Sequence, residues 1–377
     1  MKKIQMVDLK SQYEKIRNEV NAGIQEVIDT TTFIKGGKVN EFQTELEKYL
    51  GVKHVIPVGN GTDALQIAMM GLGLKPGDEV ITADFTFAAT VEVIALLQLT
   101  PVLVDVDMHN MNISIEGIKR AITPKTKAIV PVHLFGRAAN MEAIMALAKE
   151  HNLYVIEDNA QAIGANCKFS DGTKKKAGTI GHVGATSFFP SKNLGCYGDG
   201  GAMYTNNSEL AERLKMIANH GQKQKYFHEI VGCNSRLDAM QAAVLNVKLP
   251  RLDTYIAARR KVADHYDKLF ANYREMKTPV RVKESKHVFH QYTLTVNGIN
   301  RDALNAFLAE HDVPSMIYYP VPAHKQKMFA SFGSDATLLP KTDWLTERVI
   351  SLPIHTEMEQ EQLDFICSTV AKFLTKN

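Results

Sequence analysis

Short apolar runs alternate along the chain with stretches in which apolar residues recur every three or four positions. Such runs are typical of buried β-strands, and such stretches of amphipathic helices. We predict strands at residues 54–57, 79–82, 100–106, 128–132, 154–157, 185–189 and 201–205. The clearest predicted helices between them cover residues 64–70, 91–97 and 141–151. This alternation predicts an α/β fold with a mainly parallel sheet covered by helices.

The pattern changes after Gly232. A long helical region at residues 237–266, interrupted near Pro250, comes first. A strand at 291–296, a helix at 301–311, a proline-rich turn at 318–322 and a final helix at about 359–374 follow. We therefore predict a large α/β domain with an N-terminal arm at residues 1–245 and a small α+β domain at 246–377. The boundary is expected inside a long helix.

Composition excludes several classes of function. The 377 residues are 45% hydrophobic and 23% charged, with a formal charge of +3, which is ordinary for a globular protein. The run Lys174-Lys175-Lys176 reads as a solvated loop, and no basic stripe with interleaved aromatics predicts nucleic-acid binding. The four cysteines show no metal-binding spacing. Neither a signal peptide nor a membrane-length apolar run is present, so we expect a cytoplasmic location.

Three local motifs carry candidate chemistry. The first, Gly59-Asn60-Gly61-Thr62, stands between a predicted strand and a predicted helix. Glycines let the backbone approach an anion, and the start of a helix offers free N–H groups and a positive dipole end. The Thr62 hydroxyl could bind a phosphate or could only cap the helix. The motif is neither a dinucleotide fingerprint nor a P-loop.

The second motif is Glu157-Asp158-Asn159-Ala160-Gln161, at the end of an apolar strand. Ligands of open α/β sheets usually bind at the carboxyl ends of the strands. A carboxylate there can keep a pyridinium nitrogen protonated, which makes the ring an electron sink. The alternative is that Asp158 caps the turn that follows.

The third motif is Ser187-Phe188-Phe189-Pro190-Ser191-Lys192, followed by a glycine cluster at 198–201. A lysine in this setting can lose its proton and form a Schiff base if burial lowers its pKa. Ser187 could add a hydroxyl to a phosphate site. The alternative is a solvated loop lysine. Together, the three motifs supply a phosphate anchor, a partner for a ring nitrogen and an amine for a covalent bond, in that order along the chain.

In these motifs the sequence resembles the sugar aminotransferases of the DegT/DnrJ/EryC1/StrS family. The resemblance extends from Val7-Asp8-Leu9 through Phe85-Thr86-Phe87 and Asn234-Ser235-Arg236 to Tyr319-Pro320-Val321-Pro322. It implies the fold of aspartate aminotransferase, which is fold type I among pyridoxal 5'-phosphate (PLP) enzymes. Residues 1–245 would then form the N-terminal arm and the PLP-binding domain.

The resemblance also implies a role for individual residues. Lys192 would hold PLP as a Schiff base and move protons, and Asp158 would bind the pyridine nitrogen, as the two catalytic residues. Gln161 would lie near the ring hydroxyl, and Phe87 would stack on the ring unless it packs in the core. Gly61, Thr62 and Ser187 would bind the phosphate. Asn234 would reach the phosphate of a neighbouring subunit, and Arg236 would approach substrate across that interface, which implies a homodimer.

The implied reaction moves an amino group from L-glutamate to a keto group of a nucleotide-linked sugar, with pyridoxamine 5'-phosphate formed in between. It would serve the biosynthesis of cell-surface polysaccharide or lipopolysaccharide. The nearest branch acts on 3-keto UDP-N-acetyl-hexoses and hexuronates. Members that act on hexuronates commonly carry a histidine where this chain has Tyr318, before Tyr319. Both tyrosines are expected at the substrate, and the departure at Tyr318 weakens the hexuronate assignment.

Four alternatives remain open to different degrees. A 4-keto sugar aminotransferase would use the same motifs. A sugar dehydratase of the same family carries histidine in place of the lysine, so Lys192 argues against it. A non-catalytic regulator that senses PLP or sugar is expected to have a degenerate site, whereas every motif position here is filled. A nicotinamide oxidoreductase is disfavoured because no GxGxxG motif follows the first strand.

Overall fold

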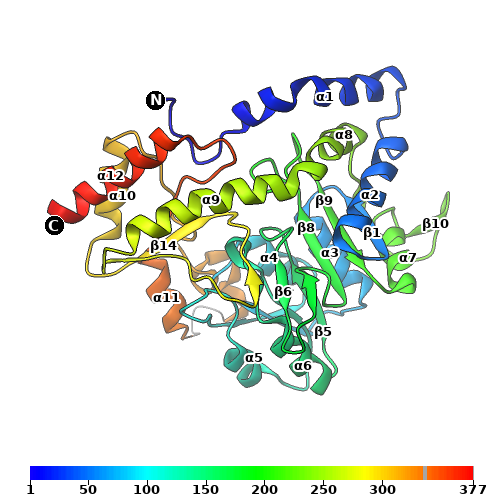
Figure 1. Ribbon diagram of the computed structural model, residues 1–377. Coiled ribbons are helices and arrows are strands. Elements are labelled where there is room, and N and C mark those ends of the chain that lie inside the picture. The colour runs from blue at the N-terminus through cyan, green and yellow to red at the C-terminus, as the bar shows by residue number, and fades with distance from the viewer. Residues whose placement is uncertain (334–337, 377) are drawn as a thin grey trace.

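The computed structural model describes residues 1–333 and 338–376 and shows one large sheet covered by helices (Figure 1). Seven strands form this sheet in the order β1-β9-β8-β5-β4-β2-β3. Their bounds are His54–Val58, Gly201–Thr205, Val183–Ser187, Tyr154–Asp158, Thr126–Val130, Glu79–Ala83 and Thr100–Val104, in the same order. Six of these strands run in one direction and β9 runs in the opposite direction, so the prediction of a mainly parallel sheet is confirmed.

The two faces of the sheet contribute to different hydrophobic clusters. Neighbouring residues of a strand alternate between them: Val80 packs into one and Ile81 into the other. The helices of this part are α1 Leu9–Asp29, α2 Gly37–Leu50, α3 Gly61–Gly71, α4 Ala88–Leu96, α5 Ile115–Ala121, α6 Met141–Glu150, α7 Ser208–Ile217 and α8 Ala239–Lys248, with the 3₁₀ turn η1 Leu134–Gly136. The long helix α1 lies along one side of the molecule, beside α8 (Figure 1).

The predicted strands are all present, with ends that differ by up to two residues. The strand predicted at 185–189 is β8, Val183–Ser187. The apolar pair Phe188-Phe189 extended the prediction, but the Phe189 side chain lies 51% exposed beyond the strand end. The helix predicted at 64–70 begins earlier, at Gly61, because the Asn60 side chain caps it by accepting a hydrogen bond from the N–H of Asp63.

The C-terminal part continues directly from α8. The 3₁₀ turn η2 (Leu249–Arg251) leads into α9 (Leu252–Phe270), so the helical region is interrupted at Pro250 as predicted. A second sheet, β12-β14-β15, packs with α9, α10 and α12 around its own cluster. The remaining bounds are β12 Met276–Lys277, β14 Tyr292–Val296, β15 Val349–Leu352, α10 Arg301–Glu310, η3 Ala323–Lys325, η4 Lys327–Phe332, α11 Pro340–Thr346 and α12 Gln360–Lys376.

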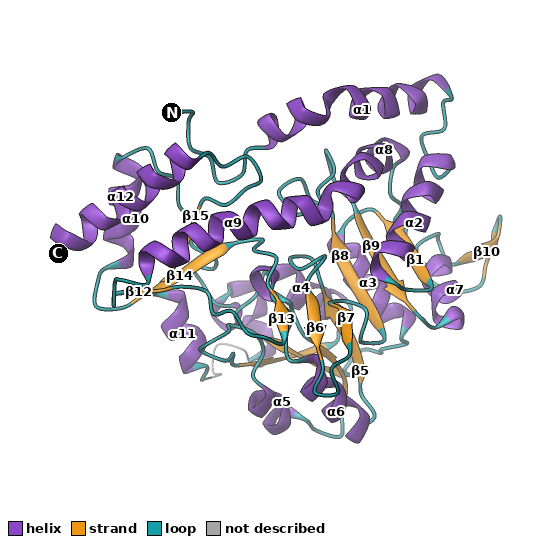
Figure 2. Cartoon of the chain, viewed as in Figure 1, coloured by secondary structure: helices purple, strands orange, loops and turns teal. Residues whose placement is uncertain are grey.

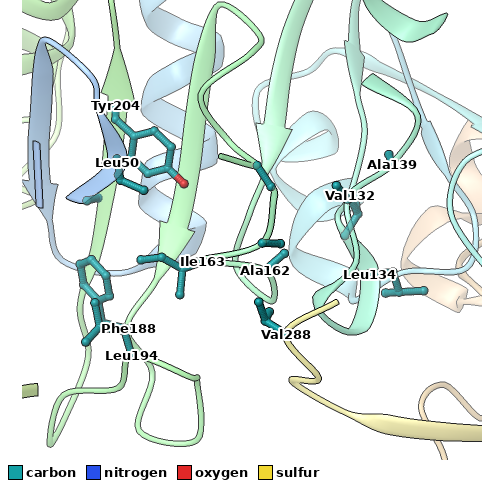
Figure 3. Packing of buried hydrophobic residues seen from close by; sticks show 14 of the residues in the cluster. Leu50, Val132, Leu134, Ala139, Ala162, Ile163, Phe188, Leu194, Tyr204 and Val288 are labelled. Atoms are coloured by element: carbon teal, nitrogen blue, oxygen red, sulfur yellow. The ribbon is translucent and has the colours of Figure 1, made fainter. Parts of the chain in front are cut away.

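The two parts of the chain share contacts. The small sheet β13-β6-β7 combines Ser285–Lys286 with Asn166–Lys168 and Lys174–Lys176 (Figure 2). Figure 3 shows Val288 in the same cluster as Leu50 and Phe188. A short hairpin, β10 Gln222–Gln224 and β11 Phe227–His228, stands at one end of the molecule (Figure 1). The division after residue 245 stays a prediction. No helix of the described residues is long and apolar enough to cross a membrane.

Candidate active site

The carboxyl ends of β1, β8, β5, β4, β2 and β3 meet at one edge of the large sheet, since these six strands run in the same direction. A cavity of about 620 Å³ opens at this edge. The three motifs line it, together with two segments of the C-terminal part. The predicted site residues in its wall are Gly61, Thr62, Phe87, Asp158, Gln161, Ser187, Lys192, Tyr318 and Tyr319.

Lys192 lies in the loop between β8 and β9. Its backbone N–H donates to the Phe189 carbonyl at 2.8 Å, which holds the loop in a turn. Burial lowers the pKa of the Lys192 amine to about 8, and the charge of Asp158 acts in the opposite direction. About a tenth of this amine is therefore unprotonated at pH 7. This form can act as a nucleophile or accept a proton.

Asp158 ends β5 and is 6% exposed. Its Oδ2 accepts a hydrogen bond from the Thr90 hydroxyl at 2.7 Å, and its Oδ1 accepts one from the N–H of Ala160 at 3.1 Å. The bond to Ala160 agrees with the alternative of a turn cap. The carboxylate also lines the cavity. The two hydrogen bonds therefore hold a buried acceptor in a fixed position in the cavity wall. The contact with Thr90, from α4, had no signal in the sequence.

Gln161 joins two walls of the cavity. Its Oε1 accepts from the N–H of Phe135 at 2.6 Å, and its Nε2 donates to the Tyr319 hydroxyl at 3.0 Å. Tyr319 comes from the C-terminal part of the chain, and burial raises the pKa of its phenol. The hydroxyl thus stays protonated, and it accepts the Gln161 bond while its own proton remains available.

Gly61, Thr62 and Ser187 form a concave corner at the start of α3. A Cβ atom on Gly61 would lie 2.7 Å from the Ser187 Cβ, so only glycine permits this approach. The first turn of a helix leaves its N–H groups without intrahelical acceptors and carries the positive end of the dipole. The corner can therefore hold an anion, with the Thr62 and Ser187 hydroxyls beside it.

Phe87 lies at the cavity and is 56% exposed, so it does not pack in the core. Its ring centre is 6.2 Å from that of Tyr319. Burial also raises the pKa of the neighbouring Tyr318, which makes a hydrogen bond to Gln291 that opposes the shift. The cavity thus has aromatic rings on the side that faces the C-terminal part.

Asn234 and Arg236 lie outside this cavity. Asn234 is exposed and bridges to Asn219, while Arg236 lines a separate cavity of about 320 Å³. The intervening Ser235 contacts the segment that carries the corner of Gly61 and Thr62. Its hydroxyl donates to Asp63 at 2.6 Å and accepts from the N–H of Gly59 at 2.9 Å. The role of Asn234 and Arg236 in a neighbouring subunit stays a prediction.

Sequence reasoning missed His290 and Gln291 as parts of the cavity wall. No motif in the sequence marked His290 as a site residue. It is 6% exposed, and its Nδ1 finds no hydrogen-bond partner in residues 1–333 and 338–376. Burial first, then the nearby Lys192 and Arg259, hold its pKa well below the usual value, so the ring is neutral. The described residues hold no group of three or more potential ligands arranged for a metal ion.

The chain matches the model of the DegT/DnrJ/EryC1/StrS aminotransferase family over residues 14–371. It is 45% identical to a "Pleiotropic regulatory protein" of Geobacillus stearothermophilus, with 98% of each chain covered. It is 43% identical to the UDP-N-acetyl-3-dehydro-alpha-D-glucosamine 3-aminotransferase of Acidithiobacillus ferrooxidans, again with 98% of each covered. Identity is also 43% to the UDP-2-acetamido-2-deoxy-3-oxo-D-glucuronate aminotransferase of Pseudomonas aeruginosa, covering 97% of this chain and 99% of that protein.

Solved structures show the same fold. DesV of S. venezuelae, in complex with a ketimine intermediate, superimposes with a TM-score of 0.94 at 37% identity, and 99% of each chain is covered. The ntda protein of Bacillus subtilis, with bound cofactor PMP, superimposes with a TM-score of 0.92 at 29% identity. That match covers all of this chain and 86% of the other.

Proposed function

Because this chain belongs to the DegT/DnrJ/EryC1/StrS aminotransferase family, we propose that it is a PLP-dependent nucleotide-sugar aminotransferase of fold type I. In the proposed reaction an amino group passes from L-glutamate to a keto group, at C3, of a nucleotide-linked sugar. One observation carries the proposal: Lys192, Asp158 and the corner formed by Gly61, Thr62 and Ser187 line one cavity.

The residues of the cavity fit PLP. The cofactor has a phosphate, a ring nitrogen and an aldehyde, and the cavity offers a partner for each. The corner formed by Gly61, Thr62 and Ser187, at the start of α3, would accept the phosphate. Asp158 would accept a hydrogen bond from the ring nitrogen, and Lys192 would offer an amine with a pKa of about 8 to the aldehyde. Phe87, exposed at the cavity, supplies a ring face, and Gln161 lies where it can contact the ring hydroxyl.

When bound, PLP supplies the electron sink and the amine-carrying carbon of transamination. The chain does the rest. Asp158, fixed by Thr90 and Ala160, keeps the ring nitrogen protonated. Lys192 would move a proton between the substrate carbon and the amine-carrying carbon of the cofactor, for which an amine pKa near the working pH is suited. Tyr319, Phe87 and the neutral His290 form part of the wall around this space.

The proposed substrate is a 3-keto UDP-N-acetyl-hexose. Two relatives at 43% identity are named for aminating 3-keto UDP sugars, and one of them acts on a glucuronate. Tyr318 can donate a hydrogen bond but carries no positive charge, so a C6 carboxylate would depend on Arg236. The alternative substrate is a 4-keto nucleotide sugar. We further propose that the product enters cell-surface polysaccharide or lipopolysaccharide biosynthesis.

We propose a homodimer in which Asn234 and Arg236 reach the site of the neighbouring subunit. Asn234 is exposed and Arg236 lies in a second cavity, so both are free of the site in their own chain. L-Glutamate as amino donor follows from family habit. A cytoplasmic location agrees with four free cysteines.

A second candidate is a PLP- or sugar-sensing regulator, which the name of the Geobacillus relative favours. The two proposals are separated by turnover. We expect the purified protein to be yellow with PLP, to bleach with L-glutamate, and to aminate a keto sugar. The assay pairs 3-keto and 4-keto nucleotide sugars, each with and without a C6 carboxylate. A protein that takes up no PLP contradicts the aminotransferase and a PLP-sensing regulator, and one that binds PLP but aminates none of these sugars favours the regulator.

A further inference from the structure

Asp84 and His324 form a buried pair beside the cavity. Asp84 follows β2 directly and is fully buried, and His324 lies in η3 and is 2% exposed. The His324 N–H donates to Asp84 Oδ1 at 2.6 Å, and the His324 Nδ1 lies 2.7 Å from Asp84 Oδ2. The two residues stand 240 positions apart in the chain. One carboxylate therefore holds both the backbone and the ring of a distant residue.

The backbone of Asp84 makes three further bonds. Its N–H donates to the Val104 carbonyl of β3 at 3.0 Å. Its carbonyl accepts from the N–H of Thr86 at 3.1 Å and from the N–H of Ala323 at 3.4 Å. Thr86 and Phe87 line the cavity. Asp84 thus ties the sheet, the turn that carries Phe87 and the segment around residue 323 to one point.

The segment at residues 318–322, called the 318–322 segment below, precedes His324 and carries both cavity tyrosines. It contains Pro320 and Pro322, which have no backbone N–H to donate. The segment therefore depends on its ends and side chains for its position. At one end Met316 pairs with Ser351 of β15, and at the other His324 is held by Asp84.

A buried pair of a carboxylate and a histidine is a weak source of stability, because the desolvation of the polar groups offsets the attraction between them. Burial does raise the pKa of the Asp84 carboxyl, and the bonds from His324 oppose that shift. On its far side, the His324 Nε2 lies 3.5 Å from Asp343 Oδ1, which also pairs with Lys325. A pair that adds little net stability but has directional bonds is suited to fixing geometry.

We propose that the Asp84–His324 pair is a positioning clamp that fixes the 318–322 segment against the end of β2, and so sets Tyr318 and Tyr319 opposite Phe87. The two residues are positioning residues, since neither lines the cavity itself. The consequence for substrate binding rests on the proposed function. The consequence for the 318–322 segment does not.

The test compares Asp84→Ala, Asp84→Asn and Ile366→Ala. Alanine removes both bonds to His324. Asparagine keeps an acceptor for the His324 N–H and can donate to an unprotonated Nδ1. Ile366, fully buried in α12, belongs to the separate C-terminal cluster, so its replacement lowers stability without touching the clamp. His324→Ala takes the place of Asp84→Ala if the latter does not fold.

Hydrogen–deuterium exchange of the cofactor-free protein is the first measurement. We expect Asp84→Ala to speed exchange in peptides covering residues 316–326 by about tenfold or more, as the loss of a charged hydrogen bond implies. Asp84→Asn should restore most of the protection, and Ile366→Ala should leave it unchanged. Exchange in Asp84→Ala that matches wild type overturns the clamp, whatever the activity of the protein.

Steady-state kinetics with the keto sugar is the second measurement. Asp84→Ala should raise KM about tenfold while kcat changes less, because Tyr318 and Tyr319 lose their position rather than their chemistry. If Asp84→Ala alters exchange but leaves KM unchanged, the clamp has no role in placing Tyr318 and Tyr319 for substrate binding. A wild-type protein that aminates no keto sugar refutes the proposed function, and the exchange experiment still decides on the clamp.

Discussion

Lys192 lies in the loop between β8 and β9 and Lys248 contacts the same loop, but the two amines differ in what surrounds them. Burial lowers the pKa of each amine to about 8. Lys192 lines the cavity at the sheet edge, near Asp158. Lys248, in the last turn of α8, is 1% exposed; its Nζ donates to the Gly195 carbonyl at 2.8 Å and lies 4.5 Å from the centre of the Tyr197 ring.

A lowered lysine pKa and a chemical role are separate properties in these two residues. A lowered pKa needs only burial, and both lysines have it. Chemistry also needs space for a ligand and groups that bind it, and only Lys192 has a cavity with an anion corner and a fixed carboxylate. Lys248 instead holds the loop that carries Lys192. A perturbed pKa is therefore a guide to function only together with a cavity.

Exchanging the two lysines for neutral residues should give the largest contrast. Lys192→Ala should lower the turnover of L-glutamate and keto sugar about 10³-fold or more, because it removes the proton-transferring amine. Lys248→Met, in protein that folds and binds PLP, should keep turnover within about tenfold of wild type, since its amine reaches no substrate. The measurement is kcat for both variants at saturating PLP. A similar loss of kcat in both variants would show that the position of Lys192 in the cavity gives it no special role in turnover.

The second-largest effect is expected in the pH dependence of stability, where the lowered pKa of Lys248 contributes. An amine with a pKa of about 8 in the folded protein and about 10.4 in the unfolded chain binds fewer protons when folded between these values. The cost of burying its charge is therefore full below pH 8 and disappears as the pH rises toward 10. We expect the unfolding free energy of the cofactor-free wild type to rise by about 2 kcal/mol relative to Lys248→Met between pH 8 and pH 10.

Urea unfolding of both cofactor-free proteins at pH 7, 8, 9 and 10 measures this difference. Lys192 is present in both proteins, so its own contribution cancels in the comparison. Two curves that stay parallel across the window would contradict a depressed pKa at Lys248.

The smallest effect is a difference in labelling. In the cofactor-free protein, acylation of Lys192 by a small amine reagent should have its pH midpoint at about 8, since the amine opens to the cavity. Lys248 should be labelled only as the protein unfolds, because the Gly195 carbonyl and the Tyr197 ring enclose its amine. Peptide mass spectrometry across pH 6–10 measures both. Equal labelling of the two in folded protein would remove the distinction.

Much of the site was predictable because its signals are local. The glycine at position 61, the carboxylate at 158 and the lysine at 192 each stand within a few residues of a strand end. Strand ends can be read from apolar runs, and parallel strands bring their carboxyl ends to one edge. The corner of Gly61 and Ser187 follows from that arrangement. The bond from Thr90 to Asp158 does not, because nothing in the pattern of α4 distinguishes Thr90 from other small helix residues.

The second wall of the cavity was predicted only in part. The family resemblance suggested Tyr318 and Tyr319, but neither His290 nor Gln291. The bond between Gln161 and Tyr319 joins residues 158 positions apart, and the bonds between Asp84 and His324 join residues 240 apart. No local pattern marks either pair. Their approach depends on how the C-terminal part packs on the large sheet.

The sequence by itself determined the order of strands and helices and which residues stand at the strand ends, because side-chain alternation and turn chemistry act over a few positions. The tertiary structure decided what surrounds each amine: a cavity beside Lys192, and a carbonyl and an aromatic ring around Lys248. Lys192 and Lys248 are alike as residues, and burial affects their pKa values alike. Only the packing of distant segments leaves open space beside one amine and fills it beside the other.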